Sequence, residues 1–106
     1  MLKLRVGEPF RGGNWDTFAV ANGYRLAGRE DEGRAVLHKE LERRPDAWAL
    51  AYNTACFEAL AGNPDAAFEH LRRALELNPE EVRPYLAEDT DLDPLRDDPR
   101  FQELTT

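Results

Sequence analysis

Histidine, the residue that most often performs acid–base catalysis, is sparse in this chain. Its two histidines, His38 and His70, fall on predicted helices beside arginine or lysine residues. A catalytic histidine needs a positioned partner and a nucleophile or substrate pocket, and the sequence places neither next to these two. We therefore expect both to be solvated side chains on helix surfaces.

The single cysteine, Cys56, limits the thiol chemistry that is possible. It excludes an internal disulfide and a thiolate-rich metal site. A nucleophilic cysteine needs a nearby base or a helix N-terminus to lower its pKa, but Cys56 lies in the middle of an apolar run on a predicted helix. We expect a buried structural cysteine.

Two acidic pairs are the remaining candidates for metal or acid–base chemistry. Glu80-Glu81 and Asp97-Asp98 adjoin prolines at expected helix starts, where carboxylates interact favourably with the positive end of the helix dipole. The chain contains no Gly-rich phosphate loop, HExxH motif or zinc-ligand spacing. The sequence thus predicts a protein that is not an enzyme, with no catalytic, cofactor-binding or metal-binding residue.

The charge of the chain narrows the class of partner. A formal net charge of −7 over 106 residues has the wrong sign for binding nucleic acid or an anionic membrane. Most of it lies in residues 80–106, which hold nine acidic and three basic residues. We interpret that end as a solvated surface, with a docking site for a basic partner as the alternative. With no membrane-spanning apolar stretch and no signal peptide in the sequence, we expect a cytoplasmic protein.

An internal repeat decides which elements must position these residues. Nine residues recur identically 34 positions further along the chain without a gap, and 34 residues is the length of a helix–turn–helix unit that stacks on copies of itself. The pairs are Ala21 and Ala55, Leu26 and Leu60, Ala27 and Ala61, Gly28 and Gly62, Asp31 and Asp65, Leu37 and Leu71, Leu41 and Leu75, Glu42 and Glu76, Pro45 and Pro79.

Periodicity and helix-breaking residues give the element boundaries. Residues 1–13 are predicted to be an extended arm and linker, residues 14–45 and 46–79 to be the two repeats, and residues 80–106 to be an acidic capping helix with short terminal turns. The predicted helices are 14–27, 30–43, 47–61, 64–78 and 80–87.

Within these elements, several residues have predicted local roles. Val36, Leu37 and Leu41 are expected to face inward, and Pro84 to lie in the first turns of its helix. Asp46 is expected to cap the third helix, and Thr90 or Asp91 a later turn. An apolar set is expected to seal the last repeat: Leu92, Leu95, Phe101 and Leu104.

The second repeat resembles a tetratricopeptide repeat. The segment Tyr52-Asn53-Thr54-Ala55-Cys56-Phe57-Glu58-Ala59-Leu60-Ala61-Gly62 is followed by Ala67, Leu71, Ala74 and Leu77-Asn78-Pro79. The first repeat keeps Tyr24, Gly28, Leu37 and Pro45 but has Gly33 and Glu40 where the family has small apolar residues, so we expect its second helix to sit loosely or in a shifted register. Residues 91–101 are similar to segments that end many bacterial arrays. The resemblance, over residues 14–104, implies an all-α, right-handed superhelix of two helical hairpins and a C-terminal capping helix.

The resemblance also implies a function and a binding surface. In the family, the first helix of each repeat lines a concave face that binds a peptide, a helix or a neighbouring domain, and some members hold a C-terminal carboxylate with asparagines and basic residues. The positions of this chain that correspond to that face are Trp15, Phe18, Asn22, Arg25, Tyr52, Asn53 and Arg83. We therefore expect non-catalytic protein–protein interaction, with a homodimer as one form of it.

A second similarity leaves an alternative open. Residues 6–10 ahead of Trp15 resemble the junction in bacterial proteins that carry a cupin barrel followed by a repeat tail. This implies an accessory or oligomerisation module of a larger cupin-like enzyme or regulator.

Overall fold

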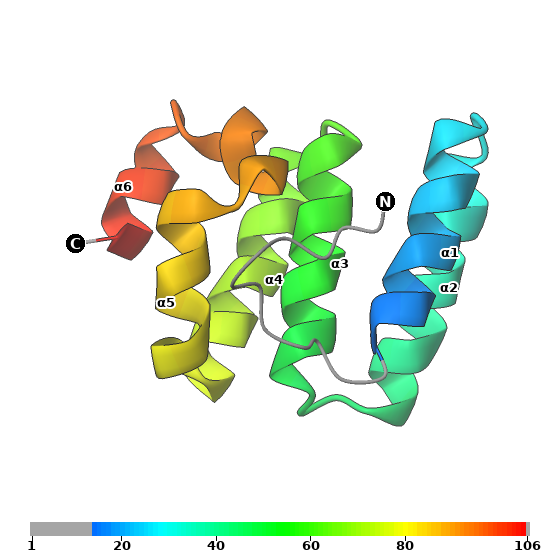
Figure 1. Ribbon diagram of the computed structural model, residues 1–106, viewed down its shortest axis with the longest axis horizontal. Coiled ribbons are helices and arrows are strands. Elements are labelled where there is room, and N and C mark those ends of the chain that lie inside the picture. The colour runs from blue at the N-terminus through cyan, green and yellow to red at the C-terminus, as the bar shows by residue number, and fades with distance from the viewer. Residues whose placement is uncertain (1–13, 106) are drawn as a thin grey trace.

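Glycines and prolines set the ends of the helices in the computed structural model, which describes residues 14–105, with side chains from residue 17 onward (Figure 1). The arm predicted for residues 1–13 lies outside this range. Every regular element in residues 14–105 is helical, so the all-α class is confirmed. The elements are α1 (Asn14–Leu26), α2 (Glu30–Arg43), α3 (Trp48–Leu60), α4 (Pro64–Leu77), α5 (Pro79–Glu88), the 3₁₀-helix η1 (Thr90–Leu95) and α6 (Pro99–Thr105).

The first four helices form two helical hairpins, α1 with α2 and α3 with α4, that close in the same way. Gly28 and Gly62 have φ angles of 80° and 85°, which glycine adopts at little cost. In each turn the following residue donates its N–H five residues back, from Arg29 to Tyr24 O at 2.8 Å and from Asn63 to Glu58 O at 2.9 Å. This is the helix-ending pattern that satisfies the last carbonyls. The 34-residue repeat is therefore visible as a repeated turn.

The two hairpins lie side by side, and α3 is the central helix. It contacts α1 and α2 on one side, α4 of its own hairpin and η1 beyond it, as Figure 1 shows. Every residue from Ala49 to Ala59 is buried. Small side chains at the helix contacts, Ala55, Ala67 and Ala74, are fully buried and allow the helices to approach closely.

The C-terminal elements cover the other side of the second hairpin. α5 and α6 pack against α4, while η1 packs against α3. The predicted apolar seal is confirmed, because Leu92, Leu95 and Phe101 are buried and Leu104 packs against them. Arg96 fixes this region by donating to the carbonyl oxygens of Leu86 at 2.7 Å and Asp89 at 2.9 Å.

Two predicted caps are wrong. The residue before α3 is Ala47, with no side-chain cap, and Asp46 instead accepts a hydrogen bond from Arg73 of α4 at 3.1 Å. The residue that caps η1 is Asp89, whose Oδ1 accepts from the backbone N–H of Asp91 at 3.0 Å. Asp46 accepts from a distant arginine, and Asp89 accepts both from the local N–H and, through its other oxygen, from the distant Tyr52 hydroxyl. The sequence does not show these distant donors.

Of two predicted placements in helix interiors, one is confirmed and one is wrong. Pro84 is the sixth residue of α5 and lies in its second turn, within the first turns as expected. The helix tolerates it because the carbonyl that loses its donor belongs to Glu80, in an exposed first turn where water can satisfy it. Val36 is half-buried and does not join the core, unlike the fully buried Leu37 and the partly buried Leu41.

Gly33 makes the first hairpin tight rather than loose. A Cβ atom at this position would collide with the carbonyl oxygen of Ala21 on α1 and would lie 3.0 Å from Cε2 of Phe57 on α3. The absence of a side chain thus lets α2 approach both neighbours. Our expectation of a loose second helix is wrong, because the missing side chain is matched by closer backbone approach.

We predict opposite effects for two glycine-to-alanine substitutions. Gly33→Ala should destabilise the fold by about 1–3 kcal/mol because the added methyl group overpacks a backbone contact. Gly23→Ala, on α1 where nothing lies within 4 Å of the added atom, should stabilise it by up to about 1 kcal/mol through helix propensity. Urea unfolding of both variants checks this, and an equal gain in both would show that α2 does not approach α1 closely.

Candidate partner-binding surfaces

The residues predicted to line a concave face come from α1, α3 and α5, and the structure divides them. Phe18, Tyr52 and Asn53 are buried, with exposed fractions of 2%, 1% and 0%. Asn22 and Arg25 are half-buried on α1, where Arg25 Nε donates to Asn22 Oδ1 at 2.8 Å. The side chain of Trp15 lies outside the described residues.

Arg83 lies apart from the α1 pair. It is exposed on α5, and α5 and α1 lie on opposite sides of α3 in Figure 1. The structure therefore brings Asn22 and Arg25 together and places Tyr52 and Asn53 next to each other in the core, but it does not gather all seven side chains into one cluster.

Tyr52 belongs to a buried polar network that the sequence did not indicate. Its hydroxyl donates to Oδ2 of Asp89 at 2.6 Å, and Sγ of Cys56 lies 3.9 Å from the same oxygen. The other carboxylate oxygen of Asp89 receives the N–H of Asp91. The network thus ties the central helix α3 to η1, and the expected buried position of Cys56 is confirmed.

The same network supplies the one group of potential metal ligands found among the described residues. One ligand atom each from Cys56, Asp89 and Asp91 lies within 4.8 Å of the others. Both oxygens of Asp89 already accept hydrogen bonds within the protein. We interpret the arrangement as a capping carboxylate anchored by a tyrosine. The spacing Asp89-Thr90-Asp91 before an apolar pair was the available sequence signal for this cap.

A buried ion pair joins the two hairpins. Glu58, on α3, is 1% exposed, and its carboxylate accepts two hydrogen bonds from Arg34 of α2, at 2.7 and 2.8 Å, and one from Asn63 at 2.9 Å. Arg34 also donates to Glu30 at 2.7 Å. This two-pronged pairing is the geometry in which a guanidinium best neutralises a buried carboxylate.

The electrostatics of this pair favour the charged forms. Burial alone would raise the pKa of Glu58, but the hydrogen bonds from Arg34 and Asn63, with the positive charge of Arg34, hold that pKa below its ordinary value. The hydrogen bonds to Glu58 and Glu30 raise the pKa of Arg34. Both groups therefore stay ionised at neutral pH, and neither is available as an acid or a base.

The two histidines approach each other across the hairpins. The ring of His38 on α2 lies 6.0 Å, centroid to centroid, from that of His70 on α4. His38 is exposed, as expected, but His70 is half-buried, so the expectation of a solvated side chain is wrong for it. Burial lowers the pKa of His70, with the charge of Glu69 acting in the opposite direction.

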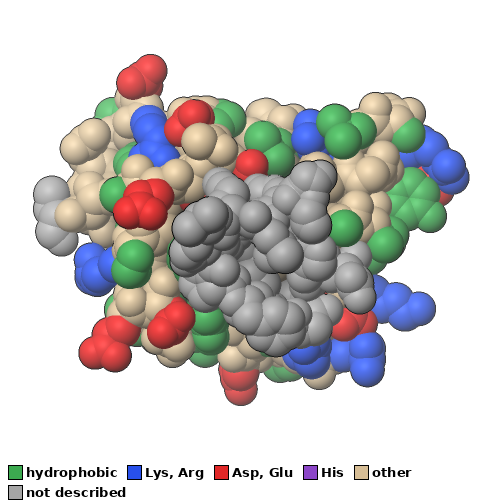
Figure 2. Space-filling view, in the orientation of Figure 1, with side chains coloured by type: hydrophobic (Ala, Val, Ile, Leu, Met, Phe, Trp, Pro, Cys, Tyr) green, Lys and Arg blue, Asp and Glu red, His purple; other side chains and the backbone are tan. Residues whose placement is uncertain are grey.

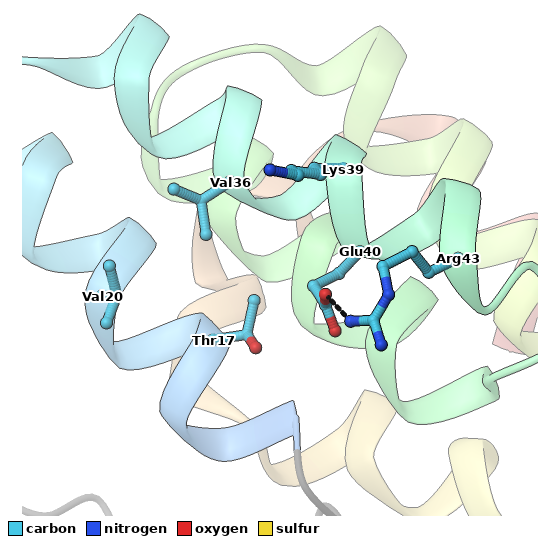
Figure 3. A pocket seen from close by; sticks show the side chains of 6 residues that line it. All are labelled: Thr17, Val20, Val36, Lys39, Glu40 and Arg43. Carbon is cyan, nitrogen blue, oxygen red and sulfur yellow. Dashed lines mark hydrogen bonds and ion pairs between the residues drawn. The ribbon is translucent and has the colours of Figure 1, made fainter.

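A groove runs along the outer side of the first hairpin, between α1 and α2. We call it the outer groove; it is open to solvent, has a volume of about 540 Å³ and is lined by Thr17, Val20, Val36, Lys39, Glu40 and Arg43. Figure 3 shows Thr17 and Val20 on α1 facing Val36 on α2, with Arg43 paired to Glu40. Val20 is 52% exposed, and Leu26, further along α1, is 71% exposed.

Charge is unevenly distributed over the face drawn in Figure 2. Several acidic side chains lie over the end formed by α5 and α6, and several basic side chains lie over the end formed by α1 and α2. Within the outer groove, Lys39 has no acidic partner among residues 14–105. The groove thus combines the exposed Val20 and the half-buried Val36 with a cation that a partner can neutralise.

Comparison of the chain with protein-family models, with curated proteins and with solved structures gives no match. Among residues 14–105, no helix combines the length and the apolar character that crossing a membrane requires.

Removing one member of the buried ion pair should be costly. We predict that Arg34→Met destabilises the fold by about 3 kcal/mol, because it leaves the Glu58 carboxylate buried without its counterion. The matched control is Arg43→Met, which removes an exposed pair with Glu40 on the same helix and should cost far less. Denaturant unfolding measures both.

The double variant Arg34→Met, Glu58→Met separates pairing from packing. It should recover most of the loss, because an apolar pair often replaces a buried ion pair without penalty. If the double variant is as unstable as Arg34→Met, the arginine contributes through its packing on Phe57, above whose ring it lies, rather than through its charge.

The lowered pKa of His70 predicts a pH dependence of stability. The unfolded chain binds a proton at His70 more readily than the folded chain does, so this contribution is complete above the ordinary value of 6.5 and is lost as the pH falls toward the folded value. We expect the free energy of unfolding to decrease below about pH 6.5. His70→Gln should remove that part of the decrease, whereas His38→Gln should retain most of it. Equal profiles for the two variants would contradict the assignment.

Proposed function

We propose that this protein is a non-catalytic protein–protein interaction module that binds a peptide, a helix or a neighbouring domain. In this proposal the two hairpins form a short, right-handed superhelix of the tetratricopeptide type. The proposal is supported by the 34-residue repeat and by the identical closing turns at Gly28 and Gly62. A stacked repeat buries each hairpin against its neighbours.

The observation that carries the proposal is an apolar side chain exposed in the groove on the outer side of the first hairpin. Residues 49–59 of α3 are all buried, whereas Val20 of α1, which lines the outer groove, is 52% exposed. Large apolar side chains exposed next to a groove are typical of surfaces that bind another protein.

The use of the buried ionisable groups supports a non-catalytic role. Glu58 is neutralised by Arg34, and Asp89 accepts hydrogen bonds from Tyr52 and from the backbone of η1. A catalytic acid or base is characteristically poised, with a pKa near the working pH and a path to substrate. These carboxylates instead join helices to one another.

The residues predicted for the concave face keep a place in the proposal. Arg83 is exposed and Asn22 and Arg25 are half-buried, so their polar atoms are available for a partner's backbone or carboxylate. Phe18, Tyr52 and Asn53 would support that face from inside the core.

The test of the function is direct binding. The full chain is immobilised and used to capture proteins from a lysate of its source organism, and each captured protein is purified and titrated against the chain by calorimetry. We expect one partner that binds saturably with defined stoichiometry, and Arg83→Glu reports whether the concave face takes part. If no captured protein binds saturably, the proposed function is wrong.

An oligomerisation or accessory module is the second candidate, and the exposure of Leu26 favours it. Sedimentation velocity of the chain alone at tens of micromolar distinguishes the two. A dimer that Leu26→Asp dissociates supports self-association, whereas a monomer at all concentrations excludes it.

A further inference from the structure

The outer groove has a counterpart inside the molecule. Moving its six lining positions by the repeat length of 34 residues gives Ala51, Thr54, His70, Arg73, Ala74 and Leu77 on the second hairpin. Three of these, Ala51, Thr54 and Ala74, are buried. The surface that is a groove on the first hairpin is therefore partly covered on the second, where His70 and Leu77 are half-buried and Arg73 stays exposed.

The element that covers this counterpart is α2. Three contacts follow its direction in order: Arg34 pairs with Glu58, His38 lies against His70, and Asp46, just beyond the end of α2, pairs with Arg73 at 3.1 Å. Glu58 is near the end of α3, and Arg73 is near the end of α4. α2 consequently runs antiparallel to α3 across the second hairpin.

From this correspondence we propose that the outer groove binds one amphipathic helix of a partner protein, lying antiparallel to α1 as α2 lies against α3. The proposal rests on the proposed function, because it names the chemical class of the partner. It commits to a helix with an apolar face and an acidic residue just beyond its C-terminal end.

The differences between the two hairpins specify the partner helix further. Val36 occupies the position in the first hairpin that His70 occupies in the second. The partner residue that packs against Val36, corresponding to His38, is therefore aliphatic. Lys39 occupies the position that Arg73, the partner of Asp46, occupies in the second hairpin. The partner residue that corresponds to Asp46 is therefore acidic. Gly23, which has open space around it, occupies the position that Phe57 occupies in the second hairpin. The partner residue that corresponds to Gly33 therefore has room for a side chain.

A second copy of this chain does not supply such a helix. Its own α2 is already committed to α3 through Arg34 and Glu58, and its α4 is covered by α5 and α6. The packing of α2 and α4 within each copy thus favours a helix from another protein over a second copy of this one.

The probe is a synthetic peptide with the sequence of α2 and its flanking residues, comprising residues 30–47 with Gly33→Leu and His38→Leu. Binding of the fluorescently labelled peptide to the full chain is followed by anisotropy. We expect saturable binding that Val20→Asp weakens at least about tenfold, because the substitution buries an unpaired carboxylate under the peptide. The matched control is Leu26→Asp, an exposed apolar residue of α1 outside the groove, which should leave binding unchanged.

A charge exchange tests the orientation. The chain variant Lys39→Glu should weaken binding of the peptide by up to about fivefold, and a peptide that also carries Asp46→Lys should bind this variant better than it binds the unaltered chain. Circular dichroism confirms that each variant is folded, which is expected because Val20, Leu26 and Lys39 are exposed.

The outcomes separate this inference from the proposed function. Absence of saturable peptide binding, or equal loss with Val20→Asp and Leu26→Asp, overturns the helix-binding groove. A dimer in sedimentation that Val20→Asp dissociates also overturns it, because the occupant is then a second copy. If a captured partner binds at full strength to the Val20→Asp variant, the groove is wrong while the proposed function stands; if no partner binds at all, the proposed function itself fails.

Discussion

The central constraint on this molecule is a helix, α3, that is buried around its whole circumference. Eleven consecutive residues, Ala49–Ala59, are buried, so each direction from the helix axis must be occupied by another element. α1 and α2 fill one side, α4 a second and η1 a third. The 3₁₀-helix η1, which lies outside the two repeats, therefore covers a side of α3 that the repeats leave open.

A helix buried on all sides brings polar atoms into the core with it, and the neighbouring elements are positioned to satisfy them. The hydroxyl of Thr54 donates to the carbonyl of Leu50 within the helix at 2.8 Å. Two further polar contacts join α3 to its neighbours: Glu58 pairs with Arg34 on α2, and Tyr52 donates to Asp89, just before η1. Because an unpaired buried charge is costly, these contacts restrict how α2 and η1 can sit on α3.

The sequence predicted the parts of the fold that depend on local chemistry. Gly28, Gly62 and Pro64 mark the helix ends because their conformational limits act over one or two residues, and the apolar spacing marked most of the core. It did not predict the pairing of Arg34 with Glu58 or of Asp46 with Arg73, because such pairs form between residues that only the folded arrangement of the helices brings together. Gly33 is the clearest case: it looked like a defect in the repeat, but a Cβ atom there would collide with the backbone of α1, so the missing side chain lets α2 approach it.

From the sequence, only the kind of candidate site could be predicted, a surface that binds another protein, and not its residues. The repeat pointed to a surface for another protein, but the residues assigned to that surface by resemblance include Tyr52, which is bonded to Asp89 in the core. The outer groove was not predicted, because the sequence does not show that the surface around Val20 and Val36 is left open when the hairpins pack. Such an absence becomes visible only when the first hairpin is compared with the second.

The link between Arg34 and Glu58 also bears on how the domain opens. If the first hairpin separated from the second, the carboxylate of Glu58 would lose its counterion among largely apolar neighbours. The free energy of separating the hairpins therefore adds to that of unfolding either one. Repeat arrays without such cross-links can fray one unit at a time. Here the backbone amides of α2 and α3 should share a single protection level in hydrogen exchange, so that the two hairpins behave as one cooperative unit.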